Sequence, residues 1–208
     1  MNELDHIVWA VPDLDESMDI FYQKTGITPQ FGGYHDSQGT KNALVRLGPK
    51  SYLELLAPDH KSSISKNRWM GIDLLTVPRI TRIAFSTTYI KEKASILNAY
   101  NPNLGLITDG HRKTPSGMTI NWKMTVPYHS TLIDLAPFFI DWSRSSMHPC
   151  QSLTEQPIEI KRIKMTSQHA QNLQKLYSDL DIKGDHIHTG AEEIMIELST
   201  PKGIVTIS

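Results

Sequence analysis

The sequence predicts a mixed α+β fold of repeated β-α-β-β-β units, because one pattern of secondary structure starts three times along the chain. Each start is a short apolar run rich in β-branched residues, which is typical of a strand: LDHIVWAV at 4–11, ITRIAFST at 80–87 and IKRIKMTS at 160–167. A helix-like stretch and three short strand-like runs follow each start. Such internal repetition predicts that the units pair with pseudo-symmetry.

The first unit, 1–58, has the clearest element boundaries. A helix is expected over 14–25, with Asp13 or Asp15 as its N-cap and Gly26 as its stop. The turn-forming segments HDSQGT and Gly48-Pro49 divide the remainder into runs that read as strands. These strands are predicted at 27–34, 42–47 and 51–57.

Two further units follow the same order and should pack with the first as one domain. The second, 79–143, predicts a helix over 89–100 and strands at 80–87, 105–108, 118–126 and 136–142. The third and shortest, 157–208, predicts a helix over 168–180 and strands at 160–167, 182–188, 193–199 and 203–207. We expect the first two units to pair and the third to extend their sheet.

The composition excludes several classes of protein. With 208 residues and a formal net charge of -1, the chain can bury a sizeable core and carries no basic stripe for nucleic acid. No apolar run approaches membrane-spanning length, and the N-terminus lacks a signal-peptide pattern. The single cysteine, Cys150, excludes an internal disulfide and agrees with a reducing compartment. These features predict a soluble, cytoplasmic protein.

Two polar residues stand in strands where a core would prefer apolar side chains. Side chains alternate across a strand, so His6 shares a face with Val8 and Ala10. In YLELLAP at 52–58, Glu54 lies on the face opposite Leu53. Because burying an unpaired carboxylate is costly, Glu54 should meet a cation, a hydrogen-bond donor or a metal.

Three stretches together resemble one protein family. LDHIVWAVPDLDESMDIFYQKTGI, then GGYHDSQGTKNALVRLG and YLELLAP, are similar to the glyoxalase-like branch of the vicinal-oxygen-chelate superfamily. TINWKMTVP and APFFIDW are similar to the second half of that branch. The resemblance implies paired modules whose curved sheets form a half-open barrel around a ligand-binding cup. In metal-using members, a histidine on a module's first strand and a carboxylate on its fourth point into this cup.

Carrying the family pattern over by position gives a candidate metal site. His6 matches the first-strand ligand, Glu54 the fourth-strand carboxylate, and Asp141 the counterpart of Glu54 in the second module. Such a set would suit Fe, Mn, Ni, Co or Zn, with three protein ligands and water. The expected second histidine is replaced by Arg82, which cannot ligate a metal.

Three interpretations of Arg82 stay open. It could pair with Glu54 or Asp141 and replace the metal by a salt-bridged network. It could instead bind a substrate carboxylate or phosphate beside a metal, or point outward into solvent. His111-Arg112-Lys113, before the predicted hairpin at 114–117, could also close over an anion, although a charged hairpin is more often only solvated.

Two classes of function follow from the resemblance. The first is a metal-assisted lyase, isomerase or dioxygenase in which Glu54 moves a proton and Arg82 or His35 orients the substrate, with Asn42 and Trp122 beside it. The second is a metal-free protein that binds or sequesters a small polar or anionic molecule. Glyoxalase I activity is not expected, since the usual four-ligand set is incomplete, and pairing of modules across a homodimer is left open.

Overall fold

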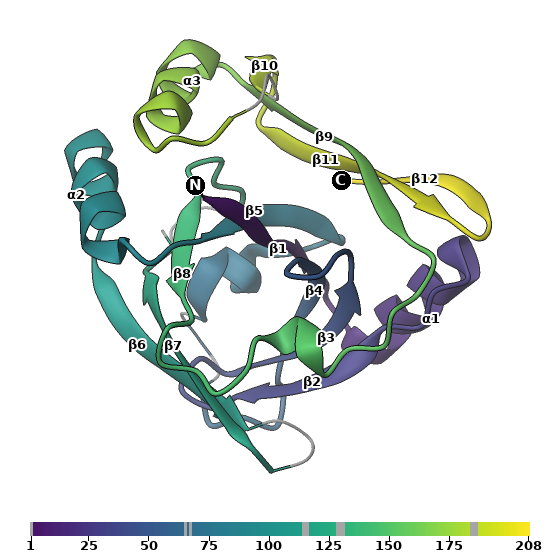
Figure 1. Ribbon diagram of the computed structural model, residues 1–208. Coiled ribbons are helices and arrows are strands. Elements are labelled where there is room, and N and C mark those ends of the chain that lie inside the picture. The colour runs from purple at the N-terminus through teal and green to yellow at the C-terminus, as the bar shows by residue number, and fades with distance from the viewer. Residues whose placement is uncertain (1, 65, 67, 114–116, 128–131, 184–186) are drawn as a thin grey trace.

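In the residues that it describes, a computed structural model of the chain shows one curved sheet of eight strands, a second sheet of four strands and three α-helices (Figure 1). The structure describes residues 2–64, 66, 68–113, 117–127, 132–183 and 187–208. In this part of the chain no helix is long and apolar enough to cross a membrane.

The eight-stranded sheet curls into a nearly closed barrel. Its strand order is β2-β3-β4-β1-β5-β8-β7-β6, so the first strands of the first two units pair antiparallel at its centre. At the other side its edge strands, β2 and β6, lie against each other. The bounds are β1 (Glu3–Ala10), β2 (Gln30–His35), β3 (Thr40–Arg46), β4 (Tyr52–Pro58), β5 (Arg79–Ser86), β6 (Ile107–Lys113), β7 (Thr119–Thr125) and β8 (Phe138–Asp141).

The first helix agrees with the prediction from its capping residues. In α1 (Leu14–Thr25), the Asp13 carboxylate accepts from the Glu16 N–H at 2.9 Å, and Gly26 ends the helix at φ 75°. The corresponding helix of the second unit is α2 (Ile90–Tyr100), and two short 3₁₀ segments, η1 (Trp69–Leu74) and η2 (Pro149–Gln151), lie in the connections.

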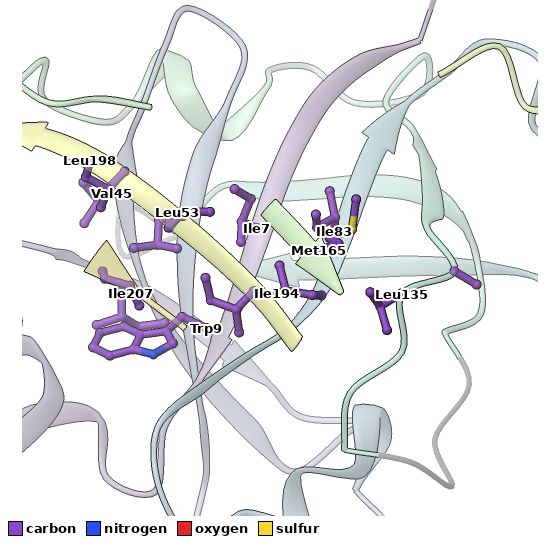
Figure 2. Close-up of a cluster of buried hydrophobic side chains, with 14 of the residues drawn as sticks. Ile7, Trp9, Val45, Leu53, Ile83, Leu135, Met165, Ile194, Leu198 and Ile207 are labelled. Atoms are coloured by element: carbon purple, nitrogen blue, oxygen red, sulfur yellow. The ribbon is translucent and has the colours of Figure 1, made fainter. Parts of the chain in front are cut away.

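The third unit forms its own sheet, so the expectation that it extends the first sheet was wrong. It consists of β9 (Glu159–Ser167), α3 (Ala170–Asp179), β10 (Ile187–Thr189), β11 (Glu193–Thr200) and β12 (Gly203–Ile207), in the order β10-β9-β11-β12. In Figure 2, Met165, Ile194 and Leu198 of this sheet face Ile7 and Leu53 of the barrel. The barrel's outer face is apolar between α1 and α2, and the third unit covers it.

Alternation along the strands separates this outer core from the barrel interior. On β1, Ile7 and Trp9 belong to the outer cluster, whereas Val8 and Ala10 belong to a second buried cluster inside the barrel. On β4, Leu53 faces outward and Leu56 inward. His6 and Glu54 are therefore in phase with the interior.

Candidate functional site

The barrel encloses a small cavity in which polar side chains from five strands meet. Its volume is about 30 Å³, which is room for about two water molecules. The apolar wall comes mainly from β7 and β8, including Trp122 and Phe138. The polar wall consists of His6, His35, Asn42, Tyr52, Glu54 and Arg112. Four residues predicted to bind metal or substrate, besides Trp122, thus lie together around one space.

Asp5 and His6 act as a pair at the start of β1. The pairing of β1 with β5 shifts register between Leu4 and His6, and this bulge brings the neighbouring side chains of Asp5 and His6 into contact with each other. The His6 Nδ1–H donates to Asp5 Oδ1 at 2.8 Å. His6 Nε2 is therefore the free acceptor of the neutral imidazole, or a donor when the ring is protonated.

Asp5 is fully buried and accepts from three rings. Besides His6, its Oδ2 accepts from Trp142 Nε1–H at 2.7 Å and from His148 Nε2–H at 3.3 Å. Burial raises the pKa of Asp5, but the hydrogen bonds from His148 and His6 outweigh it and hold the pKa below its ordinary value. Asp5 was not singled out in the sequence, where the only signal was a carboxylate directly before a strand histidine.

On β4, one carboxylate oxygen of Glu54 accepts a hydrogen bond from a neighbouring strand and the other faces His6. Its Oε1 accepts from the Asn42 amide at 2.6 Å. Its Oε2 lies 3.6 Å from His6 Nε2. Asp5, His6 and Glu54 thus form a chain of proton-carrying groups that ends at the cavity.

Aromatic rings fix the plane of the His6 imidazole. The Tyr52 ring stacks on it with centroids 4.7 Å apart, and Phe138 packs edge-on at 5.3 Å. Burial raises the pKa of Tyr52 well above its ordinary value, so its hydroxyl keeps its proton. The imidazole therefore has little freedom to rotate.

Arg112 is the polar residue of this wall that the sequence prediction misplaced. The strand expected at 105–108 runs on as β6 to Lys113, so Arg112 lies in the sheet and not in a solvated hairpin. It is opposite Ile120 on β7, and its Nη1–H donates to the Gly32 carbonyl of β2. Burial lowers the pKa of Arg112, while the Glu54 charge acts in the opposite direction.

The same stretch of β6 carries a glycine that the indole of Trp122 requires. A Cβ at Gly110 would collide with the Trp122 ring, which lies directly opposite on β7. In the sequence, the only hint of the longer strand was that Gly110 and Arg112 are two residues apart and so would share one face of a strand.

His35 closes the polar wall at the end of β2. Its Nδ1 lies 3.0 Å from the Thr40 hydroxyl. Burial lowers the pKa of His35 to about 4, with the Glu54 charge opposing it. The imidazole is therefore neutral at pH 7.

Asp141, predicted as the third metal ligand, lies outside the cavity. β4 pairs with β1 so that Glu54 is opposite Val8, whereas β8 pairs with β5 so that Phe138 is opposite Ala84. Since Val8 and Ala84 both point into the barrel, Phe138 occupies the position corresponding to Glu54. Asp141 is three residues further on, on the other face, where it accepts from the Ser143 N–H at 2.9 Å.

Arg82, predicted to clamp the substrate or bridge to Glu54, does not line the cavity either. Its Nη1–H groups donate to the carbonyls of Thr81 and Leu132, each at 2.7 Å, and Asp134 lies nearby. Burial lowers the pKa of Arg82 to about 10, with the Asp134 charge opposing it. Arg82 is bound to the connection between β7 and β8, so all three interpretations left open for it are replaced by a structural contact.

Comparison with known proteins identifies the family. A family model described as "Glyoxalase-like domain" matches residues 4–180. The chain belongs to this glyoxalase-like family, within the vicinal-oxygen-chelate superfamily. A comparison with curated proteins gave no match.

Two solved structures are similar to this chain at low sequence identity. A hypothetical protein from Staphylococcus aureus is 18% identical with a TM-score of 0.64, over 99% of this chain and 84% of that one. A methylmalonyl-CoA epimerase from Mycobacterium tuberculosis is 20% identical with a TM-score of 0.43, over 66% of this chain and 86% of that one. The first match shows a shared fold, and the score of the second supports no statement about function.

The described residues of this glyoxalase-like chain do not fit a resident divalent metal. Where the family pattern would place a second histidine and a second carboxylate, the second unit has Arg82 and Phe138. Within the described ranges, no group of three or more His, Cys, Asp or Glu side chains is placed to hold an ion. His6 and Glu54 alone fall short of the three protein ligands of a catalytic site. The buried Arg112 charge also disfavours a dication in the same space.

Segment η1 closes the cup of this glyoxalase-like chain. Met70 lies in the interior cluster and lines the cavity, in a left-handed backbone conformation with φ 57°. Arg68 ties the segment down, because its guanidinium pairs with Asp73 at 2.7 Å and its Nε–H donates to the Gly39 carbonyl at 2.9 Å. Because the cavity is so small, entry of an organic molecule requires Met70 or its neighbours to move.

Proposed function

We propose that this protein binds a small polar or anionic organic molecule inside the barrel without a resident metal. The observation that carries the proposal is the convergence of buried polar groups and an apolar wall on one small cavity, which is the usual composition of a small-molecule site. The acidic side is Glu54 with Asn42, and the basic side is Arg112 with neutral His35. The ligand would displace Met70 and the water that the cavity can hold.

The methionines offer a direct test of binding. Met70 and Met124 line the cavity, whereas Met165 lies in the outer core. Protein labelled with ¹³C at the methionine methyls would be titrated with small carboxylates, hydroxy acids and dicarbonyl compounds. We expect the Met70 and Met124 resonances to shift and that of Met165 to stay.

Variants identify the site in the same titration. Glu54→Gln keeps the shape of the side chain but removes its charge, and should weaken binding of any ligand that donates a hydrogen bond to it. Glu197→Gln on β11 of the other sheet is the matched control and should bind like the parent. Shifts spread evenly over all three methionines, or none with any compound, would contradict the proposal.

Elemental analysis tests the metal-free part separately. Protein purified without added metal or chelator should contain no stoichiometric Fe, Mn, Ni, Co or Zn. A metal that is retained by the parent and lost in a His6→Ala and Glu54→Gln double variant would restore the metal-assisted interpretation.

A second candidate function, proton transfer on the bound molecule, is favoured by the chain of contacts from Asp5 through His6 to Glu54. The Glu54 carboxylate would take a proton from an acidic C–H or O–H group, and the electron pair would stay on the ligand beside Arg112. The neutral His6 Nε2 could accept that proton, with the imidazolium stabilised by Asp5. Returning the proton to another atom would complete an isomerisation.

Exchange with heavy water tests this second candidate. A bound compound with an acidic C–H should take up deuterium with the parent protein, as followed by ¹H NMR. Glu54→Gln should stop the exchange, and Asp5→Asn should slow it. A Glu54→Gln variant that binds the compound and exchanges at the parent rate would leave binding as the function.

A further inference from the structure

In the part of the chain that the structure describes, three arginines are buried, and two of them hold connections between strands. Arg68, 8% exposed, pairs with the Asp73 carboxylate and donates to the Gly39 carbonyl. Arg82, 0% exposed, donates to two backbone carbonyls and lies near Asp134. Both guanidinium groups therefore have structural roles in holding connections between strands.

Arg112 differs from the other two in its partners. It is 7% exposed, and the Gly32 carbonyl is its one hydrogen-bond partner within the described ranges. In the same ranges no carboxylate lies within ion-pair distance of it, and Glu54 acts on it only through its charge. A guanidinium has five N–H donors in a planar fork, so most of its donor capacity is unused by the protein.

A buried charge without an ion-pair partner is costly, and a site that keeps one needs a counter-ion. The space beside Arg112 is the cavity itself. Planar oxyanions such as carboxylates match the arginine fork with two parallel hydrogen bonds, which a lysine or an amide cannot provide. The group that completes the coordination of Arg112 is therefore expected from a ligand.

The opposite wall limits how much negative charge that ligand can carry. Glu54 presents an oxygen to the cavity, and its other oxygen already accepts from Asn42. A second anionic group near Glu54 would be repelled, whereas a hydroxyl or an acidic C–H would be attracted.

We infer that Arg112 is the oxyanion subsite of the cup, and that the ligand is a small monoanion with a carboxylate at one end and a hydrogen-bond donor at the other. A short 2-hydroxy carboxylate has this arrangement. The inference rests on the proposed function, since it names the chemical class of molecule that the same cavity binds. It assigns to Arg112 the role that the sequence had suggested for Arg82.

Three commercially available probes separate the two ends of the ligand: lactate, its neutral isostere lactamide, and propionate, which lacks the hydroxyl group. Dissociation constants would be measured from the Met70 and Met124 methyl shifts. The parent should bind lactate about 10- to 100-fold more tightly than lactamide, which is the range for hydrogen bonds to charged groups. It should also bind lactate more tightly than propionate.

Substitutions locate the preference. Arg112→Met should bring the lactate-to-lactamide ratio close to one, and Arg112→Lys should keep part of it, since the charge remains and the planar fork is lost. Arg144→Met, at an exposed arginine after β8, should keep the parent ratio. Should Arg112→Met fail to fold, the parent ratio and the lysine variant still decide the question.

Each contrary result has one meaning. Equal binding of lactate and lactamide by the parent, with Met70 and Met124 shifting in both titrations, would overturn the oxyanion subsite and leave the proposed cavity in place. Retention of the full ratio by Arg112→Met would do the same. If neither probe moved the two cavity methyls, both the subsite and the proposed function would be wrong for this class of ligand.

Discussion

Replacing Asp5 by asparagine tests whether the buried Asp5 carboxylate holds His6 in place in the chain of contacts from Asp5 through His6 to Glu54. The substitution keeps the shape of the side chain but leaves one acceptor oxygen in place of two. In the parent, Oδ1 accepts from His6 and Oδ2 from Trp142 and His148. If the amide oxygen faces His6, the new NH₂ group meets the Trp142 N–H. If the oxygen faces Trp142, the NH₂ group meets His6 Nδ1, and the imidazole must move its proton to Nε2 to accept from it.

The magnitude follows from these contacts. A hydrogen bond to a charged group contributes about 1.5–3 kcal/mol, and a buried donor left without a partner costs about 1–3 kcal/mol. Breaking such a buried network should therefore lower the free energy of unfolding by about 3 kcal/mol or more. For a chain of 208 residues, this corresponds to a fall in Tm of about 6–12 °C.

The effect should also depend on pH, because the pKa of Asp5 is lower in the folded protein than in the unfolded chain. A carboxyl group of this kind stabilises the folded state at pH values above its unfolded pKa, and this stabilisation is lost as the pH falls through the folded pKa. The difference between parent and Asp5→Asn should be full at pH 7 and should shrink below about pH 4.

Urea unfolding at pH 7 and near pH 3 measures both effects. Asp141→Asn is the matched control, since its carboxylate accepts from the Ser143 N–H on the outer surface and an amide oxygen can replace it. The control should stay within about 0.5 kcal/mol of the parent. If Asp5→Asn were as stable as this control at pH 7, the role of Asp5 as the anchor of His6 would be refuted.

Three further predictions concern other buried positions. The pKa of His35 is about 4 in the folded protein and about 6.5 in the unfolded chain, so as the pH is lowered the unfolded chain binds a proton first. The free energy of unfolding should therefore decrease by up to about 3 kcal/mol as the pH falls from about 6.5 to about 4. His35→Gln should flatten this fall in urea titrations, and an unchanged slope would contradict the assignment. Burial raises the pKa of Cys150 to about 12, so iodoacetamide should label it at pH 8 only in urea, and fast labelling of folded protein would be contrary evidence. Gly110→Ala should destabilise the protein by about 1–3 kcal/mol and alter its tryptophan fluorescence, because the added Cβ displaces the Trp122 ring. A variant that matches the parent in both would show that the ring has room to shift.

The period of side-chain alternation made part of the site predictable. Once β1 and β4 were recognised, the inward positions of His6 and Glu54 followed from which neighbours were apolar and on which face. His35, Asn42 and Trp122 line the same cavity, although the sequence favoured a solvated loop for His35 and core packing for Trp122. Their roles toward a ligand stay predictions.

The residues that could not be placed from the sequence are those whose position depends on the register of strand pairing. A displacement of one residue along a strand moves a side chain to the other face, and for this reason Phe138 lies inside where Asp141 was expected. The bulge before His6 left no mark in the sequence that would distinguish Asp5 from a solvated residue. Arg112 was misplaced because β6 was predicted to end five residues too early, at 108 instead of Lys113.

The central position of β1 has a consequence for synthesis on the ribosome. One neighbour of β1 is β4, but its other neighbour is β5, which ends at Ser86, and the sheet that covers its outer face includes β11, which begins at Glu193. At about 5–20 residues per second, β1 therefore waits several seconds for β5 and about 10–40 seconds for β11. During this interval a nascent chain presents the apolar outer side of β1 and β4 to its surroundings. Of the three units, the third is synthesised last. We therefore expect the nascent chain to need a chaperone mainly before the third unit has left the ribosome and covered this apolar face.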